Sequence, residues 1–220
     1  MSRWALLALL VGCAKVFDLE PVDPAPPCLA DDFDDGAISP TTWSVLIPTS
    51  QATVTVDGGE LVITLAPITP ALNGIRSVAQ FDLTHGEIRT ELVAPPSATG
   101  GVNAGMFVFL DDLNYYAMAV ENQLLLLRAM TQNVPDELTA PFDASADRFW
   151  RIRHDVASDQ MSFETSADSA AWVVKRTVLV TVPLESMRAQ YLASVYKMNI
   201  AAPGSARFDN FAVVLLGCQP

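Results

Sequence analysis

The segment ATVTVDGGELVITL at residues 52–65 decides the fold class of this chain. Apolar and polar residues alternate on both sides of Asp57-Gly58-Gly59, a tripeptide that can take the positive φ angles of a tight hairpin turn. Successive side chains of a strand point to opposite faces. The segment therefore predicts a β-hairpin with one buried face, on which we expect Val54, Val56, Leu61, Ile63 and Leu65.

The same period of two continues through most of the chain on either side of this hairpin. Polar turns separate most of the predicted strands, and one short amphipathic helix is expected over Leu184–Leu192. Many short strands joined by polar turns predict an all-β fold, a two-sheet antiparallel sandwich. The further predicted strands cover residues 42–47, 75–81, 86–93, 104–110, 115–120, 124–130, 149–154, 161–165, 172–180 and 206–216.

Composition is consistent with one packed domain and excludes a nucleic-acid partner. Half of the 220 residues are hydrophobic and only 17% are charged, which supplies ample apolar material for a core. The formal net charge is −12, and the sequence has no cluster of Lys and Arg to meet phosphates. The same acidic balance disfavours electrostatic attachment to an anionic membrane, so any membrane attachment must come from another feature.

The N-terminus has the layout of an export signal. A basic start at Arg3 precedes an apolar run over residues 4–11, which is too short to span a bilayer as a helix. Gly12-Cys13 follows directly. We therefore expect residues 1–12 to be a signal peptide; the alternative is a buried strand or helix of the fold.

Leu10-Val11-Gly12-Cys13 resembles the bacterial lipobox, in which a peptidase cuts before the Cys and acyl chains such as palmitate are attached to it. This resemblance implies lipidation at Cys13 and anchorage to a membrane, since several acyl chains on one residue bind lastingly. Ala14 stands where an Asp would retain such a lipoprotein, which implies an exported protein at the outer membrane.

Two further features connect this anchor to the domain. Residues 13–27 end in a Pro-rich and acidic stretch, which favours an extended tether over the alternative of a first edge strand. The remaining cysteines, Cys28 and Cys218, bracket the candidate domain at residues 28–218. Outside the cytoplasm they could form a disulfide joining its ends, the alternative being two buried thiols.

Several segments of the domain, taken in order, resemble the concanavalin A-like lectin/glucanase superfamily, which includes laminin-G-like domains. The resemblance implies a jelly-roll sandwich that covers essentially the whole of residues 28–218. The segments that carry it are Asp31-Asp-Phe-Asp-Asp-Gly36 with Trp43, the hairpin at residues 57–63, Gly86–Glu91, Asn114-Tyr-Tyr116, Trp150–Arg153 with Phe163–Ser166 and Trp172, and Phe208-Asp-Asn-Phe211.

The carboxylate motif of the related glucanases is absent. Retaining members carry a Glu-x-Asp-x-x-Glu strand, because a nucleophile and an acid/base must flank the scissile bond about 5 Å apart. Here Glu87 and Glu91 share a strand face with Arg89 between them, a pattern that favours an ion-paired surface row. The sequence therefore predicts no catalysis and no catalytic residues.

Candidate ligand contacts and metal ligands come from the resemblance and from side-chain chemistry. Tyr116 and Trp172 offer flat faces for sugar stacking, with core packing as the alternative. Arg151 and Arg153 share a strand face, and Glu164 across a hairpin could pair with one of them. The metal candidates are Asp32, Asp34 and Asp209, which could hold a structural calcium; turn-capping aspartates are the alternative.

The leading functional hypothesis is a non-catalytic ligand-binding or structural module at the cell envelope, with a glycan as the suggested ligand. The first alternative is a glycan-active hydrolase with an unrecognised carboxylate pair, which requires two carboxyl groups about 5 to 10 Å apart. The second is a protein-interaction module, which requires a sizeable exposed apolar patch.

Overall fold

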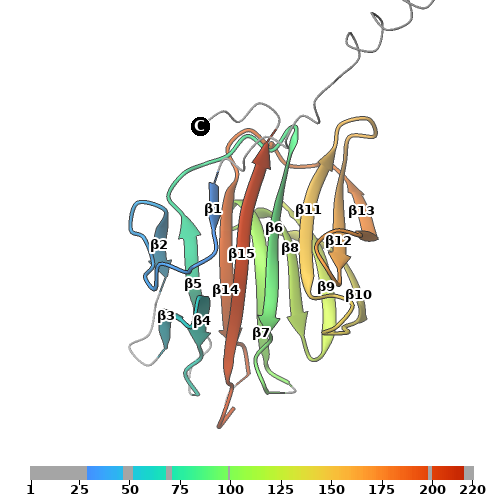
Figure 1. The fold of residues 1–220 in the computed structure, drawn as a ribbon. Coiled ribbons are helices and arrows are strands. Elements are labelled where there is room, and N and C mark those ends of the chain that lie inside the picture. The colour runs from blue at the N-terminus through green and yellow to red at the C-terminus, as the bar shows by residue number, and fades with distance from the viewer. Residues whose placement is uncertain (1–28, 47–51, 68–70, 99, 198–199, 216–220) are drawn as a thin grey trace, which may run out of the picture.

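The structure is a computed structural model, which describes residues 29–46, 52–67, 71–98, 100–197 and 200–215. These residues form fifteen strands and no helix, and the strands make two antiparallel sheets packed as a sandwich. In Figure 1 the sheet containing β15 and β6 lies in front of the sheet containing β14 and β7. The all-β prediction and its two-sheet arrangement are confirmed.

Sheet A is the front layer, with the strand order β13-β12-β11-β6-β15-β4-β3 and β1 added against β15. Its long central strands, β6 and β15, pair with each other and carry the site described below. The strands are β1 (Leu29–Asp31), β3 (Thr53–Asp57), β4 (Glu60–Thr64), β6 (Gly86–Ala94), β11 (Phe149–Asp155), β12 (Gln160–Ser166), β13 (Val173–Leu179) and β15 (Ser205–Leu215).

Sheet B is the second layer, with the strand order β10-β9-β8-β7-β14-β5-β2. Every neighbouring pair is antiparallel. The strands are β2 (Trp43–Leu46), β5 (Ala71–Ser77), β7 (Val102–Asp111), β8 (Asn114–Glu121), β9 (Leu124–Thr131), β10 (Val134–Pro141) and β14 (Arg188–Val195).

The hairpin that decided the fold class forms as predicted. Val54 lies opposite Ile63 and Val56 opposite Leu61, so the apolar side chains share the core face. Gly58 and Gly59 have φ angles of 65° and 79°, which only glycine adopts without steric cost.

An aromatic cluster fills the core between the two sheets. Trp43 and Phe211 have ring centroids 4.9 Å apart, and Tyr191 and Phe208 have theirs 4.8 Å apart. All four side chains are at most 2% exposed. Edge and tilted contacts of this kind stabilise the fold beyond the area they bury, so this cluster ties β15 of sheet A to β14 and β2 of sheet B.

The structure differs from the predicted elements at four places. The expected helix over Leu184–Leu192 is in part strand β14, which lies between β7 and β5. Strands β1 and β10 were not predicted, and strand β5 spans Ala71–Ser77 instead of residues 75–81.

The predicted signal peptide at residues 1–12, the tether at residues 13–27 and all three cysteines lie outside the described residues. Lipidation at Cys13 and the disulfide between Cys28 and Cys218 therefore stay predictions. In the part of the chain that the structure describes, no helix has the length and apolar character needed to cross a membrane.

Candidate carboxylate site

Two carboxylates face each other across the centre of sheet A. Glu91 on β6 is the direct antiparallel partner of Asp209 on β15. Their neighbours Leu92 and Phe208 point into the core, so the two carboxylates project from the opposite, outer face of the sheet. Directly opposed residues on one face have Cβ atoms about 5 Å apart, which brings the two carboxyl groups together.

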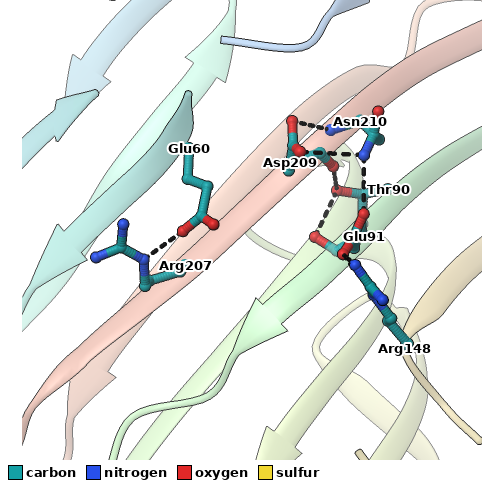
Figure 2. Close-up of polar contacts among 7 residues, drawn as sticks. All are labelled: Glu60, Thr90, Glu91, Arg148, Arg207, Asp209 and Asn210. Atoms are coloured by element: carbon teal, nitrogen blue, oxygen red, sulfur yellow. Dashed lines mark hydrogen bonds and ion pairs between the residues drawn. The ribbon is translucent and has the colours of Figure 1, made fainter. Parts of the chain in front are cut away.

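A β-bulge at Asn210 lets its side chain bridge the two carboxylates. The register of β15 against β6 shifts between Asp209 and Ala212, and Asn210 has a φ of 52°. The Asn210 Nδ2 donates to Glu91 Oε2 at 2.8 Å and to Asp209 Oδ2 at 3.1 Å (Figure 2). Because one nitrogen binds both oxygens, they are at most about 6 Å apart, the range in which two carboxyl groups can share one substrate bond.

The bulge is fixed from the core side as well. Thr90 is buried, and its Oγ1 donates to the backbone carbonyl of Asp209 at 2.9 Å. The backbone N–H of Asn210 donates to Asp209 Oδ1 at 2.6 Å. Bulges occur often beside functional sites because they redirect a side chain. Here the bulge places the Asn210 amide between the two carboxylates.

The two carboxylates lie in different electrostatic surroundings. Burial raises the pKa of Asp209, and the negative charges of Glu91, Glu60 and Asp34 raise it further, against a lowering hydrogen bond from the Asn210 backbone. Glu91 is only 3% exposed, and its Oε1 accepts a hydrogen bond from Arg148 Nε at 2.5 Å (Figure 2). The pKa of Asp209 is thus higher than that of a free aspartate, while Glu91 accepts hydrogen bonds from Arg148 and Asn210.

Arg207 and Arg148 flank the carboxylate pair, and a small pocket lies beside the bulge at Asn210. Arg207 forms an ion pair with Glu60 on β4, so the Glu60 carboxylate is occupied (Figure 2). The Arg148 side chain that covers Glu91 is itself 53% exposed. A pocket of about 280 Å³ opens beside the bulge, lined by Ala30, Asp32, Asn210, Phe211 and Ala212.

A larger pocket of about 610 Å³ lies at the far end of β6, with Glu87, Arg153 and His154 among its lining residues. The Glu87 carboxylate there is ion-paired with Arg89 at 2.6 Å and with Arg151 at 3.3 Å. The predicted ion pairing of Glu87 with Arg89 is therefore confirmed, whereas Glu91, the third residue of the predicted row, pairs with Arg148 instead. The Glu87 carboxylate of this pocket is therefore occupied, and neither Glu91 nor Asp209 is among the residues that line this pocket or the smaller one.

Arg151 and Arg153, two of the predicted ligand contacts, are occupied by one buried carboxylate. Glu164 on β12 is 1% exposed and accepts from Arg151 Nε at 2.7 Å and from Arg153 Nη2 at 3.2 Å. Trp172 lies on the same face, with its ring 4.3 Å from the Arg151 guanidinium carbon. The predicted ion pair from Glu164 is confirmed, and the role of these residues toward a ligand stays a prediction.

Tyr116 is not available to a ligand. Its side chain is fully buried in the core, where its ring packs 6.4 Å from that of Phe163. Its hydroxyl accepts a hydrogen bond from the backbone N–H of Thr181 at 3.1 Å. The prediction of Tyr116 as a ligand contact does not fit this position, because alternation along β8 turns Tyr115, and not Tyr116, to the outer face.

Two of the predicted calcium ligands, Asp32 and Asp209, make other interactions in the structure. Asp32 accepts a hydrogen bond from the backbone N–H of Asp34 at 3.3 Å, as a turn-capping aspartate does. Asp209 belongs to the carboxylate pair. Among the described residues, no group of three or more His, Cys, Asp or Glu side chains is arranged to hold a metal ion. A structural calcium stays a prediction without support from this arrangement.

Comparisons with known proteins identify solved structures that share this fold. No protein-family model matches the chain, and no curated protein does. The chain is similar in structure to a β-glucanase of Bacillus licheniformis, with a TM-score of 0.66 and 12% identity over 86% of this chain and 98% of that one. These values show a shared fold at very low identity.

Two further solved structures share this fold. An endo-acting O-glycanase from the human gut microbiota has a TM-score of 0.64 and 12% identity, over 87% of this chain and 100% of that one. A β-1,3-glucanase of Mycobacterium marinum has a TM-score of 0.60 and 15% identity, over 86% of this chain and 99% of that one. The sandwich therefore has the same fold as these glucanases and this O-glycanase, and a jelly-roll sandwich is what the sequence resemblance implied.

These neighbours correct the leading functional hypothesis. A non-catalytic module was expected, yet the three solved structures named above are two glucanases and an O-glycanase. The alternative of a glycan-active hydrolase is better supported. Sequence reasoning missed the carboxylate pair because Glu91 and Asp209 are far apart in the chain; the only signal was the Asp-Asn step at residues 209–210, a pair that tolerates a bulge.

Proposed function

We propose that this chain acts on glycans as a glycoside hydrolase, with Glu91 and Asp209 as its two carboxylates. The observation that carries the proposal is the pair itself, two carboxylates bridged by the amide of Asn210 with oxygens at most about 6 Å apart. The jelly-roll fold, which is also that of the glucanases and the O-glycanase, supports a glycan as the substrate.

The surroundings of the two carboxylates assign a role to each. Asp209, whose pKa is raised by burial and by neighbouring negative charges, suits the general acid that protonates the leaving oxygen. Glu91, oriented by Arg148 and Asn210, suits the nucleophile. A separation of about 5 to 5.5 Å is typical of enzymes that retain the anomeric configuration.

The proposed reaction has two steps. In the first, Glu91 bonds to the anomeric carbon as the glycosidic bond breaks, and the proton of Asp209 passes to the leaving oxygen. In the second, Asp209 takes a proton from water, and the hydroxyl displaces Glu91 from the sugar. Glu91 is covered by Arg148, so the substrate must displace this exposed guanidinium to reach it.

The test is a hydrolysis screen of the full chain. Mixed-linkage β-glucan, a β-1,3-glucan, xylan and mucin O-glycans serve as substrates, and the release of reducing ends is the readout. We expect hydrolysis of at least one substrate, and a loss of about 10³-fold or more in Glu91→Gln and in Asp209→Asn. The matched control is Glu87→Gln, four residues earlier on the same face of β6, which should keep the activity.

Two results would overturn the proposal. One is a wild-type chain that releases no reducing ends from any substrate of the panel. The other is a Glu91→Gln or Asp209→Asn variant that folds and keeps full activity, because hydrolysis would then use other groups.

A further inference from the structure

A half-buried aromatic side chain lies beside the carboxylate pair on the outer face of sheet A. Phe149 on β11 is the direct antiparallel partner of Glu91 on β6. Its neighbour Trp150 is fully buried in the core, so Phe149 points to the outer face, as Glu91 does. Directly opposed residues on one face have Cβ atoms about 5 Å apart, which brings the Phe149 ring next to the Glu91 carboxylate.

Core packing does not account for this ring. Among the described residues, the apolar side chains that form the core or pack against it do not include Phe149. Its other cross-strand partner is Ser166 on β12, a polar residue. The guanidinium carbon of Arg148 lies 5.3 Å from the centroid of the Phe149 ring, within the range of a cation–π contact. The ring therefore stands among polar groups, with one cation over it.

Arg148 covers both the ring and the carboxylate. Its Nε donates to Glu91 Oε1 at 2.5 Å, and the same guanidinium lies over Phe149 (Figure 2 shows the contact with Glu91). The Arg148 side chain is 53% exposed, so it can turn into solvent without unpacking the core. A substrate that displaces Arg148 from Glu91 therefore uncovers an aromatic face at the same time.

The groups around the pair have an order across the strands. From β15 to β6 to β11, the outer face presents Asp209, then Glu91, then Phe149. On the other side of Asp209, the pocket of about 280 Å³ beside Asn210 reaches β1. Neighbouring strands are about 4.8 Å apart, which is close to the length of one sugar unit. These groups therefore suit successive units of a glycan that runs across the strands.

We propose that the glycan lies across sheet A, with a sugar on the glycon side stacked on Phe149 and the leaving unit toward the pocket beside Asn210. This inference rests on the proposed function, in which Glu91 attacks the anomeric carbon and Asp209 protonates the leaving oxygen. Because Asp209 marks the side of the leaving group, the glycon continues past Glu91 toward β11. A flat aromatic ring stacks on the apolar face of a pyranose with equatorial substituents, so the substrate class is a β-linked glucan or xylan.

Binding to an inactive variant tests the role of Phe149 apart from catalysis. The full chain carrying Glu91→Gln is titrated in a calorimeter with cellohexaose, laminarihexaose and xylohexaose, and with α-linked maltohexaose as the reference. We expect saturable binding of at least one β-linked hexaose and weaker binding of maltohexaose. Adding Phe149→Ala should weaken binding about 5-fold or more, and adding Phe149→Trp should keep it, because stacking requires a flat ring.

The matched control is Phe107→Ala, which removes an aromatic ring from the outer face of the other sheet. Phe107 lies on β7 between the core residues Met106 and Val108. Thermal melting checks that both alanine variants fold. The inference is overturned if no β-linked hexaose binds, if Phe149→Ala leaves binding unchanged, or if Phe107→Ala weakens binding as much as Phe149→Ala does.

Aryl glycosides test the direction of the glycan. In p-nitrophenyl β-glycosides the aryl group leaves, so every sugar lies on the glycon side. We expect kcat/KM of the wild type to be about 10-fold or more higher for a β-cellobioside or β-xylobioside than for the matching monosaccharide glycoside, and Phe149→Ala to remove most of this preference. A preference that survives Phe149→Ala overturns the direction. A wild type that hydrolyses no glycoside and no polysaccharide refutes the proposed function and the direction with it, whereas the titrations of Glu91→Gln still decide whether Phe149 binds the sugar.

Discussion

The Glu164→Gln variant tests how the charged outer face of sheet A is held. Glu164 is 1% exposed and is the shared acceptor of Arg151 and Arg153. A Gln keeps the shape but has one acceptor oxygen, and its amide group turns donors toward a guanidinium. The substitution therefore breaks a buried ion pair while leaving the arginines in place.

The magnitude follows from burial and from the partners that remain. Breaking a buried pair by removing one partner costs about 3 to 5 kcal/mol. Arg151 keeps Glu87 at 3.3 Å, which favours the lower end, about 3 kcal/mol. For a chain of this size that corresponds to a fall in Tm of roughly 6 to 12 °C.

Thermal unfolding followed by circular dichroism at neutral pH measures the effect, with Glu87→Gln as the control. Glu87 is 13% exposed and pairs with the more exposed Arg89 and, at the longer distance of 3.3 Å, with Arg151, so we expect its loss to cost about 1 kcal/mol. A fall in Tm below about 2 °C for Glu164→Gln, or one no larger than for Glu87→Gln, would refute the reasoning.

Three further substitutions test other parts of the structure. Because the pKa of Asp209 is raised in the fold, stability is lost as pH rises through that pKa; Asp209→Asn should raise the Tm at neutral pH and not at pH 3, and a pH-independent effect contradicts this. A Cβ at Gly74 would lie 1.8 Å from the carbonyl oxygen of Tyr191, so Gly74→Ala should destabilise by at least about 3 kcal/mol in urea unfolding; a neutral effect contradicts the close approach. Phe211→Ala should cost about 3 to 5 kcal/mol in the same assay, because its buried ring packs on Trp43, and a cost below about 1 kcal/mol contradicts that packing.

Alternation was enough to predict most of the sandwich, and it failed where the sheet context changes the pattern. The predicted helix over Leu184–Leu192 runs from a loop into strand β14, where Leu192 stands on the outer face between Gln190 and Ser194 and interrupts the alternation. Strand β10 is exposed almost throughout and contains Pro135 and Pro141, as an edge strand does. Both segments therefore depart from a simple alternation of apolar and polar residues.

The candidate site was harder to predict because it depends on register. The ion pairs of Glu87 and of Glu164 followed from alternation on neighbouring strands and were predicted. The approach of Glu91 to Asp209 requires β6 to pair with β15, a contact between the middle and the end of the chain. It also requires the bulge at Asn210, which a single sequence does not specify.

The most direct test of the central claim is covalent labelling of the nucleophile. Activated 2-deoxy-2-fluoro glucosides and xylosides slow the second step of retaining hydrolysis, so that the sugar stays on the carboxylate that attacked it. Mass spectrometry of the digested chain then locates the adduct. The account predicts one adduct, on the peptide that contains Glu91, and none in Glu91→Gln. An adduct on another carboxylate, or hydrolysis of a glycan without any adduct, would contradict the account.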